Sequence, residues 1–184
     1  MKITKVIDII TRDDQESFTL DDLVGTPAPF AYQINYTAQG YGKFKIDPKT
    51  VNVLAKNLYK IEDPMSRKQI YRILHDMLKT SDICGVQLLD ICTANMAHET
   101  AVDVISTCLQ RIIPVVIKSY LPTSVFAEKK GDMFEMILGI LASGNIKDKA
   151  TEGLVLNSLF GSAVLEKHLD LLVNWFNNNT VTDL

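Results

Sequence analysis

Two Asp-Pro pairs mark where this chain must become helical. In Asp47-Pro48 and in Asp63-Pro64, the Asp side chain can accept hydrogen bonds from the free N–H groups of a first helical turn. The Pro suits the first helical position, because an N–H there would have no partner within the helix. Apolar residues then recur with helical spacing, and those expected to face a core are Val51, Leu54, Ala55, Leu58, Ile61, Ile70, Ile73, Leu74, Met77 and Leu78.

The following residues keep this helical period. We expect further helices over residues 83–95, 98–120, 122–129, 132–143, 148–160 and 162–177. Gly144 and Gly161 suit helix ends, Ser162 suits a helix start, and Pro114 should kink or split the helix around it. Short connections predict antiparallel pairs stacked side by side, as a bundle or as an irregular, HEAT-like α-solenoid.

The first 46 residues have a different pattern, that of short strands and turns. The candidate strands are KITKVIDII, SFTLDDL, FAYQINY and YGKFKI, and the last two resemble a hairpin around the turn TAQG. Four short strands cannot bury both faces of a sheet alone. We therefore expect a mainly α fold, in which a small antiparallel β segment over residues 1–46, the tail of a larger sheet, precedes a helical domain over residues 47–184.

The composition is that of a folded globular protein, with 47% hydrophobic and 22% charged residues. A net charge of −3, spread along the chain, gives no sign of a nucleic-acid surface. The longest apolar run, residues 112–117, contains a proline and is far too short to span a membrane. Cys84, Cys92 and Cys108 lie in apolar helical patterns, so we expect buried thiols in a reducing, cytoplasmic compartment.

The single His-Glu pair raises the question of a zinc site. The H-E-x-x-H motif needs a second His four residues after the first, so that both imidazoles reach one metal from one helical face. His98 is instead followed at that distance by Val102, and we interpret His98 and Glu99 as part of an ordinary first helical turn. A second set, Cys84, Cys92, His75 and His98, has no Cys-x-x-Cys pair and matches no zinc-finger spacing. We expect no metal or cofactor in this chain.

Other catalytic patterns are incomplete. The stretch GYGK, residues 40–43, is followed by Phe44 where a phosphate-binding loop has Ser or Thr, and FGSAV lacks the second Gly of a nucleophile elbow. Four cations make the second helix basic on its polar side: Arg67, Lys68, Arg72 and Lys79. They form either a solvated face or a contact surface for a carboxylate-bearing partner.

The stretch from Asn35 to Leu78, with the MAHET segment of residues 96–100, resembles part of the aminopeptidase N family of zinc metallopeptidases. There the last strands of a β-sandwich carry an Asn, then Gly-Tyr, and an Asp that leads into helix; a KIEDPLxR-like segment, an aromatic-rich helix and an LPHET segment follow. The matching residues here are Asn35, Gly40, Tyr41, Asp47, Lys60 to Arg67, Tyr71, Arg72, Asp76, Met77 and Met96 to Thr100.

This resemblance implies a β-sandwich tail over residues 1–46 and the start of a helical C-terminal domain over residues 47–184. The family's H-E-x-x-H and Gly-x-Met-Glu-Asn motifs are absent here, so the chain has no expected catalytic residue. The resemblance implies a catalytic domain upstream in the same polypeptide, with zinc and peptide substrates, and a helical domain that covers its chamber. Arg67 and Arg72 are the candidate contacts with the peptide carboxylate or the neighbouring domain.

Three alternatives remain open from the sequence. Arg67 and Arg72 can instead pair with Glu62, Asp63 or Asp76 on neighbouring turns. The chain can be a stand-alone α-helical repeat adaptor that binds a peptide or protein on a concave surface. It can also be an autonomous enzyme of another type, although no complete catalytic constellation is visible.

Overall fold

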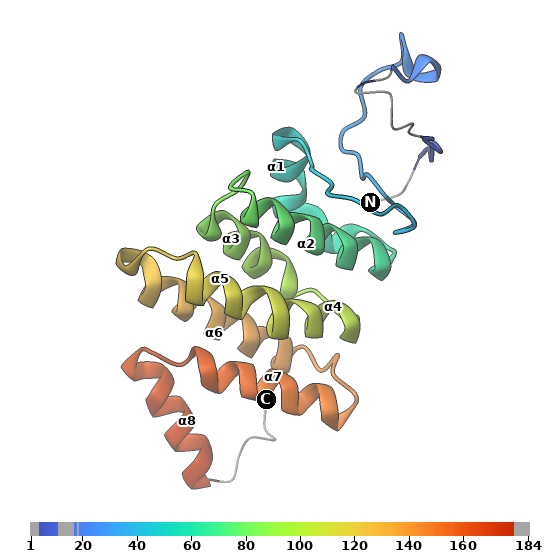
Figure 1. Ribbon diagram of the computed structural model, residues 1–184. Helices are drawn as coiled ribbons and strands as arrows, with labels where there is room; N and C mark the ends of the chain where they lie inside the picture. The colour runs from blue at the N-terminus through green and yellow to red at the C-terminus, as the bar shows by residue number, and fades with distance from the viewer. Residues whose placement is uncertain (1–3, 11–16, 18, 179–184) are drawn as a thin grey trace.

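The computed structural model describes residues 4–10, 17 and 19–178, and the described chain is mainly helical (Figure 1). The α-helices are α1 (Pro48–Asn57), α2 (Pro64–Lys79), α3 (Gly85–Met96), α4 (Val102–Ser106), α5 (Ile113–Ser119), α6 (Phe126–Ala142), α7 (Lys149–Ser162) and α8 (Glu166–Asn178). Three short 3₁₀ turns, η1 (Asp21–Leu23), η2 (Leu58–Lys60) and η4 (Thr123–Val125), and the π-helical segment η3 (Thr107–Ile112) complete the regular structure.

The helices stack in chain order, with α1 at one end and α7 and α8 at the other (Figure 1). Helix α1 packs against α3, and α3 packs against α6. On the other side of the stack, α2 packs against α4 and η3, which in turn pack against α7. Contacts of α2 with α3, α3 with α5 and α6 with α7 join the two sides. The mainly α fold expected from the sequence is therefore present, with helices packed side by side.

One continuous hydrophobic core runs through this stack. Nine of the ten apolar positions expected to face it after the two Asp-Pro pairs are buried, and Ala55 packs against it from the edge. Tyr71, Leu88 and Phe134 are among its largest fully buried side chains. Burial of each such side chain contributes about 1.5–3 kcal/mol to stability. The helical spacing of apolar residues therefore identifies the side chains of α1 and α2 that contribute to the core.

Both Asp-Pro pairs begin helices as expected. Asp47 accepts hydrogen bonds from the Lys49 and Thr50 N–H groups at 2.9 and 3.1 Å. Asp63 accepts from the Met65 and Ser66 N–H groups at 3.2 and 2.9 Å. These bonds satisfy backbone donors that a helix leaves without internal partners.

Replacing Asp63 with alanine should cost about 1 kcal/mol of stability at neutral pH. Hydrogen bonds from Ser66, first from its hydroxyl, lower the pKa of the Asp63 carboxyl. A carboxyl with a lowered folded-state pKa stabilises the fold above its unfolded pKa and loses this effect as pH falls through the folded pKa. In urea denaturation, the difference between wild type and Asp63→Ala should therefore shrink below about pH 4. Glu62→Ala is the control. If Asp63→Ala lowered stability equally at neutral pH and below about pH 4, Asp63 would not act as a charged helix cap.

The helix expected over residues 98–120 is continuous from Val102, but its regular α geometry is interrupted just before Pro114. Helix α4, the π-helical η3 and helix α5 follow each other without a break from Val102 to Ser119. In a regular α-helix the Pro114 ring would collide with the Gln110 carbonyl and leave it without a donor. The wider π turn immediately before α5 accommodates this conflict.

Several expected helix boundaries are wrong. Where two helices were expected over residues 122–129 and 132–143, one helix, α6, begins at Phe126 after η4 and continues through Gly131, which faces Leu165 and His168. Gly144, with a φ of +65°, follows the end of α6 as expected. Gly161 does not end a helix and Ser162 does not start one: both lie in the last turn of α7, where the Ser162 hydroxyl donates to the Leu159 carbonyl at 2.7 Å.

The β segment expected over residues 1–46 is not confirmed. Within the described part of that range there is no strand, and residues 2, 3 and 18 of the candidate strands lie outside the described residues. The turn between FAYQINY and YGKFKI does form, because the Asn35 side chain accepts from the Gly40 N–H at 2.8 Å and donates to its carbonyl at 3.0 Å. The two segments do not pair as strands because an isolated two-stranded hairpin is only marginally stable without further strands.

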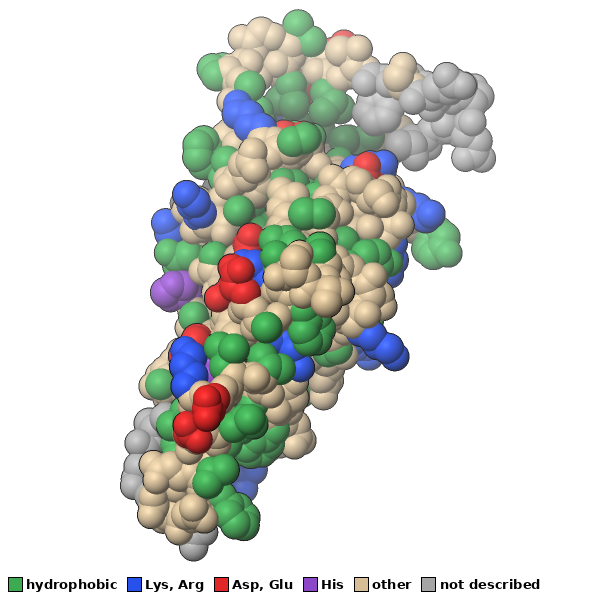
Figure 2. All heavy atoms as spheres, turned by 90° about the vertical axis from the view of Figure 1, so that its left-hand side faces the viewer, with side chains coloured by type: hydrophobic (Ala, Val, Ile, Leu, Met, Phe, Trp, Pro, Cys, Tyr) green, Lys and Arg blue, Asp and Glu red, His purple; other side chains and the backbone are tan. Residues whose placement is uncertain are grey.

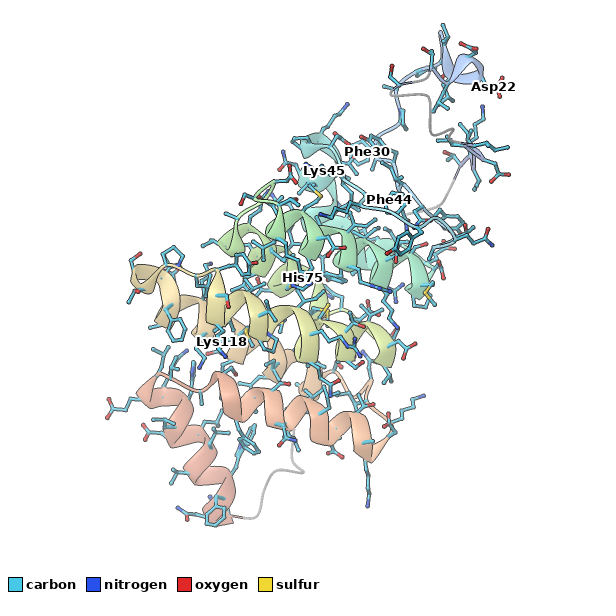
Figure 3. All side chains as sticks on the ribbon, viewed as in Figure 1. Asp22, Phe30, Phe44, Lys45, His75 and Lys118 are labelled. Atoms are coloured by element: carbon cyan, nitrogen blue, oxygen red, sulfur yellow. The ribbon has the colours of Figure 1, made fainter. Side chains whose placement is uncertain are left out.

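The described residues between 4 and 46, which we call the N-terminal segment, join the helical stack at their end. Lys45 pairs with Asp82 at 2.8 Å, and the Ile46 N–H donates to the Met77 sulfur at 3.3 Å. Phe44 packs on the core (Figure 3). The start of the N-terminal segment extends away from the stack (Figure 1), whereas its last residues are held against the helices.

Candidate functional site

The His-Glu pair does not begin a helix. Residues 97–101 connect α3 to α4, which starts at Val102, so the expected first helical turn at His98 and Glu99 is wrong. The His98 ring stacks on Tyr59 with ring centroids 4.4 Å apart. The Glu99 side chain instead turns inward and is 3% exposed. The two side chains therefore serve separate contacts and do not share a ligand.

Glu99 forms a buried ion pair with Arg67 of α2. The Arg67 Nε donates to one carboxylate oxygen at 2.7 Å, and a terminal nitrogen donates to the other at 2.6 Å. The remaining terminal nitrogen of Arg67 donates to the Ile61 and Glu62 carbonyls at 2.5 and 3.0 Å. The planar guanidinium fork matches a carboxylate in this two-bond arrangement.

The Glu99 carboxylate also caps the connection into α4. One of its oxygens accepts hydrogen bonds from the Thr100 and Ala101 N–H groups at 3.0 and 2.9 Å. The Arg67–Glu99 pair thus ties together α2, the α1–α2 connection and the α3–α4 connection. All its hydrogen-bonding groups have partners inside the chain, so this geometry suits a structural crosslink and not proton transfer to a ligand.

The structure separates the two arginines named as candidate contacts. Arg67 is 7% exposed and fully engaged with the chain, whereas Arg72 is exposed on α2. Arg72 has no ion pair with any described residue, and Asp76 pairs with Lys79 at 3.0 Å. Sequence reasoning missed Glu99 as the partner of Arg67. One signal was available: Arg67 lies three and four residues before Ile70 and Tyr71, on the apolar face of α2.

The second set of candidate metal ligands does not assemble. The described residues contain no group of three or more His, Cys, Asp or Glu side chains placed to hold a metal ion. Cys92 and Cys108 are buried as expected, and burial, followed by hydrogen bonding with Cys92, raises the pKa of the Cys108 thiol. Cys84 was expected to be buried but is exposed, because its sulfur caps α3 by accepting from the Gln87 N–H at 3.5 Å.

Tyr71 and His75 of α2 also have shifted pKa values. Burial raises the pKa of Tyr71 well above its ordinary value, and the nearby Cys108 and Cys92 act in the same direction. Burial, followed by the charge of Lys79, lowers the pKa of His75. Both effects favour the neutral form of the side chain, that of buried Tyr71 and that of half-buried His75.

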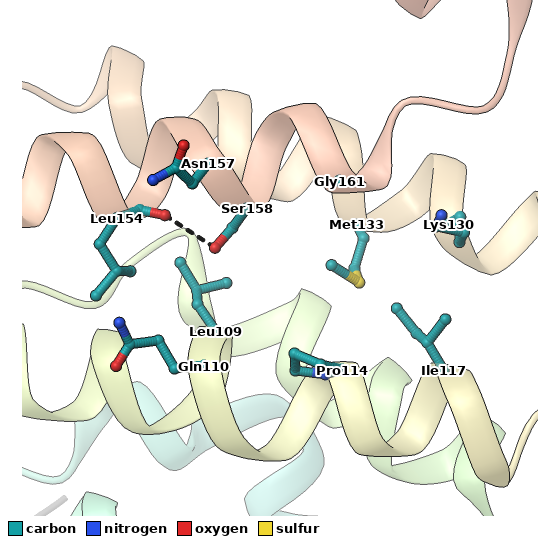
Figure 4. A pocket seen from close by; sticks show the side chains of 10 residues that line it. All are labelled: Leu109, Gln110, Pro114, Ile117, Lys130, Met133, Leu154, Asn157, Ser158 and Gly161. Carbon is teal, nitrogen blue, oxygen red and sulfur yellow. Dashed lines mark hydrogen bonds between the residues drawn. The ribbon is translucent and has the colours of Figure 1, made fainter.

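A groove lies on the surface between α5, α6 and α7, and we call it the α5–α7 groove (Figure 4). Its volume is about 420 Å³. Helix α7 forms one wall, η3 and α5 form the other, and α6 contributes two side chains (Figure 4). The lining residues are Leu109, Gln110, Pro114, Ile117, Lys130, Met133, Leu154, Asn157, Ser158 and Gly161.

The polar groups of the α5–α7 groove are largely unpaired. The Ser158 hydroxyl donates to the Leu154 carbonyl of its own helix at 2.9 Å. The side-chain amides of Gln110 and Asn157 make no hydrogen bond to a described residue. Lys130 is half-buried, its ammonium lies 5.4 Å from the Phe126 ring centroid, and no described carboxylate lies within ion-pair distance. The groove therefore combines an apolar lining with hydrogen-bonding groups and one uncompensated cation.

The neighbouring acids are occupied by a different lysine. Lys129 pairs with Asp90 at 2.8 Å and with Asp132 at 3.0 Å.

On the face drawn in Figure 2, acidic and basic side chains are interspersed with apolar ones. Among the described residues, no helix combines the length and the apolar character needed to cross a bilayer.

No protein-family model, curated protein or solved structure matches this chain.

Proposed function

We propose that this chain is a noncatalytic, helical C-terminal portion of a zinc aminopeptidase of the aminopeptidase N family, an enzyme that removes N-terminal residues from peptides. In this proposal residues 1–46 are the end of a β-sandwich, and residues 47–184 begin an irregular, HEAT-like α-solenoid. The motif resemblance between Asn35 and Leu78 motivates the proposal. The observation that carries it is the character of the N-terminal segment.

The N-terminal segment exposes large apolar side chains that the helical stack does not cover. They include Val6, Ile9, Ile10, Val24, Phe30 and Tyr41. Tyr41 is fully exposed, and Phe30 is 71% exposed. This concentration of exposed apolar side chains in one segment supports a contact with another protein surface. Strands of a sandwich that are missing from this chain would provide such a surface.

The junction with the helices supports a rigid connection to that sandwich. The Lys45–Asp82 pair and the Ile46–Met77 hydrogen bond fix the last residues of the N-terminal segment against α2 and its C-terminal end. Asp47 then caps α1 directly. Because no flexible Gly/Ser linker intervenes, the helical stack would keep a fixed position over a neighbouring domain. A lid of this kind excludes water and limits which peptides enter.

In this proposal the chemistry belongs to the catalytic domain of the same polypeptide. A zinc ion there would polarise water for attack on the peptide bond, and a Glu would act as the base. The helical part would shape access for peptide substrates, with exposed Arg72 as the candidate contact and Arg67 as a support inside α2. The free cysteines fit a reducing, cytoplasmic compartment.

The test compares this chain with a protein extended upstream along its own reading frame. We expect the extended protein to contain H-E-x-x-H, retain one zinc after dialysis and hydrolyse aminoacyl amides, and the chain alone to do neither. In the extended protein, Arg72→Ala should raise KM for long peptides more than for an aminoacyl amide, with Arg111→Ala as an exposed control. Stoichiometric zinc or turnover by the chain alone would contradict the proposal, as would an in-frame stop codon shortly upstream.

A second candidate is a stand-alone helical adaptor. The α5–α7 groove favours it, because the groove is a lined depression on the helical stack and is remote from the N-terminal segment. In that case the exposed apolar side chains of the N-terminal segment would contact a separate protein. The upstream reading frame distinguishes the two candidates, since an adaptor requires no catalytic domain in the same polypeptide.

A further inference from the structure

We propose that the α5–α7 groove binds an extended peptide segment that carries apolar side chains and one acidic side chain. The proposal rests on the groove itself and holds whether or not the chain is part of a peptidase. It is argued from three features of the groove: its apolar floor, the open space at Gly161 and the placement of its unpaired polar groups.

The floor of the groove suits small apolar side chains. Leu109 of η3 and Met133 of α6 lie between the two walls, and Leu154 and Ile117 lie toward opposite ends (Figure 4). Met adapts its shape to varied partners because its chain is unbranched and flexible. An extended peptide places every second side chain on one face, so alternate apolar residues would contact this floor.

Gly161 leaves the groove open at the end where Lys130 lies (Figure 4). A methyl group built on Gly161 would meet no atom of a described residue within 4 Å. This position lies in the last turn of α7, and glycine is a poorer helix former than alanine. Gly161 has no positive φ and no described neighbour close enough to require a glycine. Its position in the groove lining leaves space for a ligand.

Charge complementarity selects an acidic ligand. Lys130 has no carboxylate partner among the described residues, because Asp90 and Asp132 bind Lys129 instead. Lys130 is half-buried on the groove wall, where water screens its charge less than at a fully exposed site. A carboxylate bound next to it would gain an ion pair without breaking an existing one.

The unpaired amides favour a peptide over an aliphatic carboxylate. Gln110 and Asn157 each offer a donor and an acceptor to the groove, and a peptide backbone offers the matching pair. Both amides are exposed, and an acyl chain covering them would remove them from water without providing hydrogen-bond partners, which is unfavourable.

The acidic group should come from a side chain and not from a peptide terminus. Capture of a terminal carboxylate generally uses several converging backbone N–H groups. The walls of the groove are helical, and the backbone N–H groups in the interior of such a wall are bonded within the helix. Lys130 is then the single cationic donor, which a Glu or Asp side chain can reach while the peptide continues past it.

The test uses the chain itself with blocked peptides. The probe is acetyl-Ser-Leu-Ser-Leu-Ser-Glu-Ser-amide, which places two Leu and the Glu on one face, and its control has Gln in place of Glu. We expect saturable binding, with a dissociation constant of about 1 mM or lower, seen as amide NMR shifts at Gln110, Met133 and Asn157. The Gln control should bind roughly fivefold more weakly, and Lys130→Gln should remove that difference.

Two further variants test the location. Gly161→Leu should weaken binding at least about tenfold by filling the groove, and Gly161→Ala should have a smaller effect of the same sign. Gly153→Leu, at a second open position in α7 outside the groove, and Lys56→Gln, on α1, should leave binding unchanged. These controls separate groove blocking from general effects on α7 or on net charge.

Four results would overturn the proposal. They are no saturable binding of the Glu peptide, unchanged binding by a folded Gly161→Leu variant, tighter binding of acetyl-Ser-Leu-Ser-Leu with a free terminal carboxylate, and tighter binding of octanoate. None of these measurements depends on zinc or on aminopeptidase activity, so a failure here is distinguishable from a failure of the proposed function.

Discussion

Replacing Glu99 with alanine should lower the free energy of unfolding by about 3–5 kcal/mol. The substitution leaves the buried Arg67 guanidinium without its carboxylate and removes the acceptor for the Thr100 and Ala101 N–H groups. An uncompensated buried charge, and not the lost attraction alone, dominates such a loss. In a chain of this size the melting temperature should fall by roughly 6–20 °C.

The control for this prediction is the exposed Lys68–Asp103 pair. Its charged atoms are 3.7 Å apart and Asp103 is largely exposed, so Asp103→Ala should change stability by roughly 0.5 kcal/mol or less. The double variant Arg67→Met with Glu99→Leu should be more stable than Glu99→Ala, because it removes both buried charges together. Urea denaturation measures all three variants. If Glu99→Ala were as mild as Asp103→Ala, the pair would not be the crosslink that the geometry indicates.

For the Arg67–Glu99 pair, the sequence indicates the burial of Arg67 but not the identity of its partner. The position of Arg67 on the apolar face of α2 is readable from spacing, and it indicates that the side chain is buried. Its partner lies 32 residues further along the chain, beyond the range of local patterns. As partners within the chain, the sequence offered only neighbours on adjacent turns, because pairs three or four residues apart are the ones that helical geometry predicts.

Local chemistry was the reliable part of the sequence analysis. The helix starts at Asp47 and Asp63 and the interruption near Pro114 follow from hydrogen bonds and sterics within one or two turns. Gly161 and Ser162 were misassigned for a tertiary reason: Leu159 and Ser162 are buried against the stack, and this packing carries α7 past the glycine. Tertiary packing overrides intrinsic preference in such cases.

The α5–α7 groove was not predictable from the sequence. Its lining comes from η3, α5, α6 and α7, and the sequence does not specify how closely those elements approach one another. Lys130 gave no signal, because a lysine on a helix is usually solvated. Its difference from Lys129, which is paired with two acids, becomes visible only when Asp90 of α3 is placed beside α6.

Replacing Gly85 with alanine should destabilise the fold by about 1–3 kcal/mol, although alanine is ordinarily the better helix former. Gly85 is the first residue of α3, and an added methyl group would lie 2.5 Å from the Tyr120 carbonyl oxygen and 2.9 Å from its Cβ. The nearest atom belongs to the backbone, so the methyl group can be accommodated only if α3 and the end of α5 move apart.

The matched control for Gly85→Ala is Gly153→Ala. Gly153 lies inside α7, and a methyl group there would meet none of the chain's described atoms within 4 Å. This substitution should therefore stabilise the protein by up to about 1 kcal/mol, because alanine loses less backbone freedom than glycine on folding. The two variants make the same chemical change, so opposite signs in urea denaturation would isolate the close approach of α3 to Tyr120. A neutral or stabilising Gly85→Ala would mean that α3 and the end of α5 are not held this close. The stack would then be more loosely packed at the C-terminal end of α5, one of the helices that line the α5–α7 groove.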